Sequence, residues 1–151
     1  MSGGPVWRPA PAIRFKALGL HWRQGRLLAV EVLDDAGKVK GVRPLGGGVE
    51  FGETARDAVI REFREELGIV VTVGGSPVFM ENIFRHEGSI GHEVIALFDV
   101  TFPEGAFDGQ TRLSFREEGG TVCFAEWFDP DGLDRPERPR LYPEGLKDLL
   151  R

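Results

Sequence analysis

The chain has 151 residues, 41% of them hydrophobic and 28% charged, with a formal net charge of −5 at pH 7. This length suits one domain with a substantial core, and the negative charge argues against stable nucleic-acid binding, which needs a basic surface. The single cysteine, Cys123, excludes an internal disulfide and is expected to be a free buried thiol. No apolar run predicts a signal peptide or a membrane span, so we expect a cytoplasmic protein without membrane partners.

In chain order, residues 1–11 are rich in Gly and Pro and predict a flexible N-terminal arm, and residues 12–151 predict a single domain. Apolar runs, some alternating and some continuous, then predict a series of strands. These strands are expected at residues 13–22, 27–33, 69–73, 78–84, 93–102 and 121–128, and residues 39–45 lead into a run of glycines. Residues 129–140 predict a loop, and Pro143 predicts the start of a short helix that ends at Leu150.

One helix is predicted together with both of its ends. Thr54 is suited to be its N-cap, Asp57 occupies the capping-box position, and Gly68 can end the helix in a left-handed conformation. Apolar residues between these ends recur at helical spacing and predict one buried stripe. The stripe consists of Ala55, Ala58, Val59, Phe63 and Leu67. A helix between strands, with a second helix near the C-terminus, predicts an α/β sandwich.

Three glutamates, Glu62, Glu65 and Glu66, lie on this predicted helix. Their i, i+3, i+4 spacing places them on one side of it, away from the apolar stripe. Three like charges this close repel one another unless a cation neutralises them. Carboxylate oxygens favour Mg²⁺, with Mn²⁺ as a substitute. Taken alone, the three residues also fit a solvated acidic face.

A run of three glycines, Gly46, Gly47 and Gly48, comes shortly before the helix. A backbone without side chains can approach a phosphate closely or offer a carbonyl to a metal. The same run taken alone also fits a flexible turn. Arg43, close before the glycines, is a candidate for phosphate binding or for an exposed surface position.

Residues 47–69 resemble the signature of the Nudix (MutT-like) hydrolases. That signature is Gly, five residues, Glu, seven residues, Arg-Glu, an apolar residue, one residue, Glu-Glu, one residue, Gly and an apolar residue. Its fixed positions are filled here by Gly47, Glu53, Arg61, Glu62, Phe63, Glu65, Glu66, Gly68 and Ile69. The resemblance implies an α/β/α sandwich with a mixed sheet, in which the signature forms a loop–helix–loop catalytic motif.

The resemblance also implies a Mg²⁺-dependent pyrophosphohydrolase that cleaves a nucleoside diphosphate linked to another moiety. The substrate could be a sugar nucleotide, a dinucleotide polyphosphate or a nucleoside triphosphate. Glu62 and Glu66 are expected to bind the metal, and Glu65 is expected to be a ligand or the general base. Glu53 and Arg61 are expected to form an ion pair that orients the glutamates.

The glycine run has an implied role in the same site. A backbone carbonyl at Gly46 or Gly47 is expected to join the metal ligands, and Gly46, Gly47, Gly48 and Arg43 are the expected substrate contacts.

Other acidic and histidine residues leave alternatives open. Glu117 and Glu118 lie where several relatives carry a further catalytic acid before the last strand, but they also fit solvated loop acids. His92 and Glu93 begin a predicted strand and fit either a catalytic or a structural role. The remaining histidines, His21 and His86, are expected to be structural.

Specificity is not fixed by the signature. Ile83 and Phe84 stand where ADP-ribose pyrophosphatases often carry a proline, and Arg85 and His86 stand where diadenosine polyphosphate hydrolases often carry a tyrosine. Several phenylalanines fit either base stacking or the core. These are Phe79, Phe84, Phe98 and Phe115.

Two other functions are compatible with a Nudix fold. The first is a non-catalytic nucleotide sensor, against which the complete set of signature residues argues. The second is an isoprenoid diphosphate isomerase, against which the late position of Cys123 argues. A homodimer is compatible with the family, and nothing in the sequence decides it.

Overall fold

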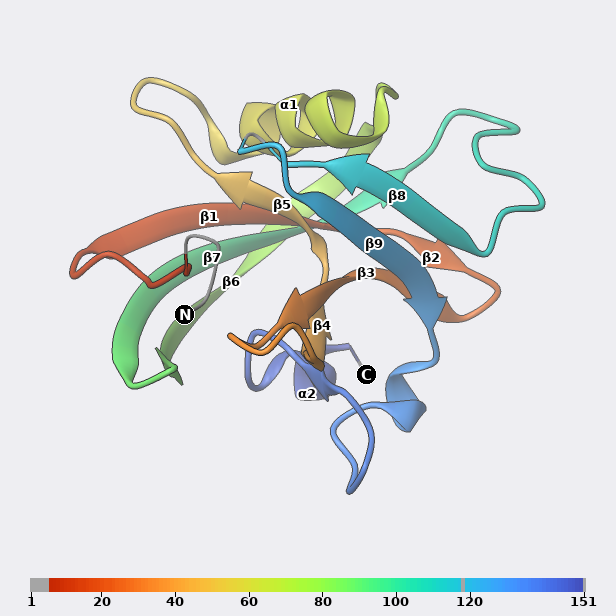
Figure 1. Cartoon of the computed structure of the whole chain (residues 1–151). Coiled ribbons are helices and arrows are strands. Elements are labelled where there is room, and N and C mark those ends of the chain that lie inside the picture. The colour runs from red at the N-terminus through yellow and green to blue at the C-terminus, as the bar shows by residue number, and fades with distance from the viewer. Residues whose placement is uncertain (1–5, 118, 151) are drawn as a thin grey trace.

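The computed structural model describes residues 6–117 and 119–150, so residues 1–5 of the expected arm and Glu118 lie outside the described residues. The strands form two mixed sheets, and helices lie on two sides of them (Figure 1). The predicted mixed α/β class is confirmed, with the strands divided between two sheets.

The first sheet has four strands in the order β5-β1-β7-β6. Strand β1 (Ile13–Leu20) pairs in parallel with β7 (Ser89–Thr101) and antiparallel with β5 (Leu45–Gly48). Strand β6 (Thr72–His86) pairs antiparallel with β7 and forms a long hairpin with it. The strands predicted at 69–73 and 78–84 are therefore one element, because a bulge lets β6 keep its pairing with β7 past its glycines.

The second sheet follows the order β10-β4-β3-β9-β8, and β2 adds to β3. Its strands are β2 (Trp22–Arg23), β3 (Arg26–Leu33), β4 (Val39–Arg43), β8 (Arg112–Arg116), β9 (Val122–Phe128) and β10 (Arg140–Leu141). All neighbours in it are antiparallel except β10 and β4.

Several strands were not predicted from the sequence, among them β5 and β8. The glycine run forms β5 rather than a loop, because Gly47 pairs with Ala17 and the main chain continues the first sheet. Strand β8 has only two buried apolar residues, Leu113 and Phe115, between exposed polar ones. That alternation is clear, but a stretch this short stands out little beside the longer apolar runs.

Helix α1 (Ala55–Leu67) begins and ends where the sequence predicts. The Thr54 hydroxyl accepts a hydrogen bond from the Asp57 N–H at 3.1 Å. Gly68 has a φ of 71°, and its N–H donates to the Arg64 carbonyl. Both ends are thus fixed by local bonds, so the register of the helix over the sheets does not depend on packing alone.

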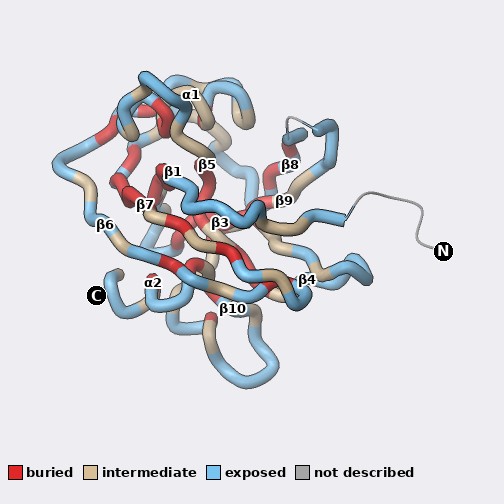
Figure 2. The backbone as a smooth tube through the Cα atoms, turned by 90° about the vertical axis from the view of Figure 1, so that its left-hand side faces the viewer, coloured by how far each residue is buried: buried red, intermediate tan, exposed pale blue. Residues whose placement is uncertain are grey.

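Two apolar clusters form the core (Figure 2). The first packs beneath α1 and includes Val59 and Phe63, which are almost fully buried. The second includes Leu146 of the short helix α2 (Leu146–Leu149). The C-terminal helix is shorter than the stretch from Pro143 to Leu150 that was predicted, and within the predicted loop Pro130–Gly132 forms one 3₁₀ turn.

The described part of the N-terminal arm contacts the sheets. The Arg8 guanidinium binds the Asp35 carboxylate at 2.6 and 3.0 Å, and the Trp7 ring lies edge-on to His86 at 5.0 Å. Through Trp7, the arm therefore lines part of the pocket that is described in the next subsection.

We expect Gly46→Ala to lower the free energy of unfolding by about 3 kcal/mol. The φ of Gly46 is 146°, and a Cβ there would overlap the Ala17 carbonyl oxygen on β1. Gly25→Ala is the control, since Gly25 also has positive φ but open space around it, and it should cost about 1 kcal/mol. Urea unfolding of both variants measures the difference, and equal losses would contradict this account of β5.

Candidate active site

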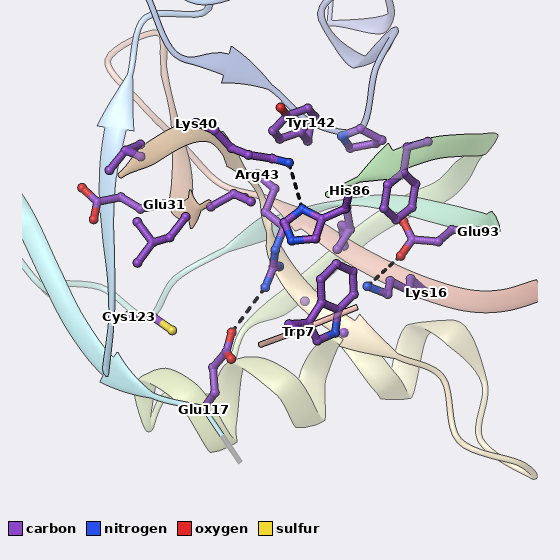
Figure 3. Close-up of a pocket in the computed structure, with 18 of the residues that line it drawn as sticks. Trp7, Lys16, Glu31, Lys40, Arg43, His86, Glu93, Glu117, Cys123 and Tyr142 are labelled. Carbon is purple, nitrogen blue, oxygen red and sulfur yellow. Dashed lines mark hydrogen bonds and ion pairs between the residues drawn. The ribbon is translucent and has the colours of Figure 1, made fainter. Parts of the chain in front are cut away.

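A pocket of about 630 Å³ lies between the two sheets. Its lining includes Arg43, Gly46 and Gly47 near α1, and Tyr142 lies on the other side of it (Figure 3). A volume of this size accommodates a nucleotide-sized ligand.

Arg61 is the centre of an ion-pair network beside this pocket. Its Nε and one terminal nitrogen donate to the two carboxylate oxygens of Glu53 at 2.8 and 2.9 Å. The same terminal nitrogen donates to the Gly48 carbonyl at 3.0 Å, and the other donates to Glu62 Oε1 at 2.9 Å. The expected Glu53–Arg61 ion pair is therefore present, and it joins the strand, the connecting loop and the helix.

The network also changes proton affinities. Hydrogen bonding to Glu53 raises the pKa of Arg61 above its ordinary value, although partial burial opposes the shift. Hydrogen bonding to Arg61 in turn lowers the pKa of Glu53. Both groups are therefore charged at neutral pH, and the fork geometry of the guanidinium matches the carboxylate.

Glu62 lies against the backbone of β5. A Cβ on Gly47 would be 2.6 Å from Glu62 Oε1, so a side chain at this position would displace the carboxylate. Only glycine lets the helix and the strand approach this closely. The close approach of Glu62 is therefore the structural reason for glycine at position 47, rather than the flexibility of a turn.

Glu66 has the most unusual environment of the signature residues. Its Oε1 is buried and has no hydrogen-bond partner among the described residues. Burial raises the pKa of Glu66 to about 8, Arg43 opposes the shift, and Glu62 and Glu117 add to it. An unpartnered buried carboxylate oxygen is costly unless a proton or a cation neutralises it.

Arg43 and Glu117 complete this end of the pocket. Glu117 follows β8, and its Oε1 lies 3.5 Å from an Arg43 terminal nitrogen (Figure 3). Arg43 is half-buried and lines the pocket, which favours the phosphate-binding alternative over a plain surface position. Glu118, the other acid proposed from the sequence, is outside the described residues.

Glu65 lies apart from the other two glutamates. Its side chain is 59% exposed and approaches an Arg61 nitrogen at 3.4 Å. The structure thus separates the three glutamates that the helical spacing placed on one side: Glu62 and Glu66 turn toward the pocket-lining residues, and Glu65 lies on the surface. None of the three glutamates lines the pocket directly. Glu62 lies next to the pocket-lining residue Gly47, and Glu66 lies near Arg43 and Glu117, which also line the pocket.

These residues fit a hard divalent cation. Glu62 and Glu66 supply carboxylate oxygens, one of them buried and unpartnered, as Mg²⁺ and Mn²⁺ prefer. A different group of closely spaced ligand atoms occurs at Asp35, His86 and Glu87. That group is the weaker candidate, because Arg8 already neutralises Asp35 through two hydrogen bonds.

Cys123 is half-buried on β9 and lines the pocket, so the expectation of a buried thiol needs correction. Its Sγ donates weakly to the Thr121 carbonyl at 3.8 Å, and burial raises the pKa of the thiol to about 12. A thiol that stays protonated is a poor nucleophile. This environment does not support the cysteine chemistry of an isomerase.

The histidines expected to be structural have partners. His21 stacks on Phe102 at 3.6 Å and accepts a hydrogen bond from Trp127 Nε1 at 3.1 Å, and burial lowers its pKa to about 4. His86 lies 2.8 Å from the Lys40 ammonium and lines the pocket.

Several pocket residues were not recognised from the sequence. Lys16, Asn82, Tyr142 and Trp7 line the pocket, and the Lys16 ammonium lies 2.8 Å from Glu93 Oε2. Glu93 was named from the sequence with its role left open, whereas no sequence pattern singled out Lys16.

The four phenylalanine candidates separate clearly. Phe84 lines the pocket, and Phe98 and Phe115 are buried in the core. Phe79 is exposed on the outer face of the first sheet and stacks on Phe15.

Comparison with known proteins identifies the family. A family model described as the NUDIX domain matches residues 14–148, so the chain belongs to the NUDIX family. Together with the hydrolase structures below, this match indicates a hydrolase acting on pyrophosphate bonds. No curated protein matches the chain. Among the described residues, no helix is long and apolar enough to cross a membrane.

Solved structures share the fold at low sequence identity. The MutT NUDIX hydrolase from Burkholderia pseudomallei is 24% identical, with a TM-score of 0.62, over 90% of this chain and 95% of that one. The ORF135 protein of E. coli is also 24% identical, with a TM-score of 0.57, over 87% and 81%. A NUDIX-family hydrolase from Clostridium perfringens is 17% identical, with a TM-score of 0.55, over 91% and 98%.

The raised pKa of Glu66 predicts a pH dependence of stability in metal-free protein. The folded state binds this proton more tightly than the unfolded chain, so the free energy of unfolding should fall as pH rises from 4.5 to about 8. Urea unfolding in EDTA should show this fall in the wild type and lose much of it in Glu66→Gln. Exposed Glu65→Gln should keep it. Millimolar Mg²⁺ should raise the wild-type melting temperature at pH 8, where the proton is lost. Identical pH profiles in all three proteins would contradict the assigned environment.

Proposed function

We propose that the chain is a Mg²⁺-dependent pyrophosphohydrolase that cleaves a nucleoside diphosphate linked to another moiety. The observation that carries this proposal is the unpartnered buried oxygen of Glu66. It lies close to a second carboxylate, that of Glu62, and to a cationic side chain, that of Arg43, beside a nucleotide-sized pocket. The membership of the NUDIX family supports the same reaction class.

Each residue has a role that follows from its contacts. Glu62 and Glu66 hold the metal, which when bound neutralises phosphate charge and acidifies the attacking water. Arg43 contacts a phosphate oxygen from the pocket wall. The main chain of Gly46, Gly47 and Gly48 lets the pyrophosphate approach the strand, with a carbonyl at Gly46 or Gly47 as a further metal ligand.

The reaction also needs a group that accepts the proton of the attacking water. Glu65 is the proposed base from the signature, and its side chain is 59% exposed, so water can reach it. Glu117 is a second candidate, because it reaches the pocket beside Arg43. The pH profile of kcat in Glu65→Gln and Glu117→Gln separates the two, since only loss of the base removes the acidic limb.

The direct test is a phosphate-release screen with Mg²⁺ over nucleoside triphosphates, sugar nucleotides and dinucleotide polyphosphates. Glu66→Gln is expected to lower turnover by at least about 100-fold while the protein stays folded. Glu104→Gln, an exposed loop acid, is the control and should retain wild-type turnover. Nucleotide binding without any turnover would contradict the proposal and point to a sensor.

Arg61→Lys tests the orienting role of the guanidinium. Lysine keeps the charge but cannot bridge Glu53, Glu62 and Gly48 together, so kcat/KM should fall by about 10–100-fold with a smaller effect on melting temperature. Arg56→Lys is the matched control on the same helix.

Arg56 donates to two carbonyls of β6, at Val73 and Gly75, and touches none of the glutamates. Its substitution should lower stability and leave kcat/KM close to the wild-type value. Equal losses of kcat/KM in the two variants would mean that Arg61 only supports the fold.

A further inference from the structure

Three buried polar side chains gather in one place. Among the described residues, the buried polar or charged ones are Asn82, His86 and Glu93, which are 8%, 6% and 9% exposed. All three line the pocket between the sheets. Two of them have a partner in the protein, because His86 lies 2.8 Å from the Lys40 ammonium and Glu93 lies 2.8 Å from the Lys16 ammonium. Asn82 and the remaining acceptor positions of Glu93 are therefore the polar groups that this wall offers to a ligand.

Asn82 and Glu93 are direct cross-strand partners on β6 and β7. Partners on one face of an antiparallel pair have Cβ atoms about 5 Å apart, so one planar ligand edge can reach both. The Lys16 ammonium lies 2.8 Å from Oε2 of Glu93 (Figure 3). A carboxylate has about four acceptor positions, so Glu93 can still accept hydrogen bonds from a ligand.

The walls around these groups suit a flat ring. Phe84 lies two residues beyond Asn82 on β6, and its ring covers Gly91 so closely that any Cβ there would overlap it. Val32 and Tyr142 line the pocket from the second-sheet side. Phe84, Val32 and Tyr142 thus place apolar side chains beside Asn82 and Glu93, a combination common in ligand-binding pockets.

The spacing across the first sheet agrees with a nucleotide. Gly48 on β5 pairs with Lys16 on β1. The next strand across the sheet, β7, carries Glu93, and the strand after it, β6, carries Asn82. Two strand spacings separate β5 from β7 and a third leads to β6, so Glu93 and Asn82 lie about 10 and about 14 Å across the sheet from the glycine strand. The phosphates can therefore lie by the glycines and Arg43 while the base reaches Glu93 and Asn82.

We infer that this pocket selects a nucleobase with an exocyclic amino group, which donates to the Glu93 carboxylate while Asn82 pairs with the neighbouring ring edge. This inference rests on the proposed pyrophosphohydrolase function and adds the substrate class. Cytosine, adenine and guanine each carry such an amino group, whereas uracil and hypoxanthine present a carbonyl or hydrogen there. A carbonyl opposite a carboxylate leaves two acceptors facing each other, which disfavours those bases.

The test compares kcat/KM within three substrate pairs: CTP with UTP, ATP with ITP, and GTP with ITP. The wild type should prefer the amino-bearing member of at least one pair by tenfold or more, and the responding pair identifies the base. Glu93→Gln should abolish or reverse that preference, because a glutamine N–H can donate to a carbonyl. Asn82→Ala should raise KM for the preferred nucleotide more than it lowers kcat.

Glu81→Gln is the matched control. Glu81 neighbours Asn82 on β6, but its side chain is 78% exposed and outside the pocket lining, so the preference should stay unchanged. Hydrolysis of all nucleotides with no amino preference, or with a preference that Glu93→Gln leaves intact, would overturn the inference and leave the proposed function standing.

If no nucleotide is hydrolysed, the proposed function fails, and calorimetric binding of CDP with UDP, ADP with IDP and GDP with IDP gives a separate answer. Tighter binding of the amino-bearing member of one pair, lost in Glu93→Gln, would support base selection in a non-catalytic protein. Equal binding within all three pairs would reject it.

Discussion

The guanidinium of Arg61 holds the candidate site together. It bonds Glu53 in the loop, the Gly48 carbonyl on β5 and Glu62 on its own helix. These bonds fix the distance between the glycine strand and the helix, and the absence of a side chain on Gly47 allows the Glu62 carboxylate to fill that space. The positions of the Glu53 and Glu62 carboxylates depend on this arrangement. A lysine would supply the same charge but not the geometry.

An acidic protein faces an electrostatic difficulty in binding an anionic substrate, and the pocket resolves it by separating its polar groups. At one end, the carboxylates of Glu62 and Glu66 favour a cation, and Arg43 adds positive charge. At the other, Asn82 and Glu93 provide neutral and acceptor groups between apolar walls. In the function we propose, the metal-binding end would be common to many substrates, whereas Asn82 and Glu93 would distinguish among them. A signature confined to the first end would then leave the substrate open.

The sequence was most informative where local chemistry determines structure. The helix ends at Thr54 and Gly68 follow from capping rules that need no tertiary information. The pairing of the glycine run into β5 depends on a distant partner strand, so no local pattern revealed it. The outward position of Glu65 was missed for a similar reason: helical spacing gives a shared side of the helix, but only packing decides which members face the pocket. Lys16 and Glu93 come together through the pairing of β1 with β7, which sequence order does not predict.

The most direct test of the central claim is a crystal structure with Mn²⁺ and a non-hydrolysable nucleoside triphosphate, with the metal located by its anomalous signal. The account predicts Mn²⁺ bound by Glu62 and Glu66, with the phosphates beside Arg43. A metal bound instead by Asp35, His86 and Glu87, with none at the helix, would contradict it.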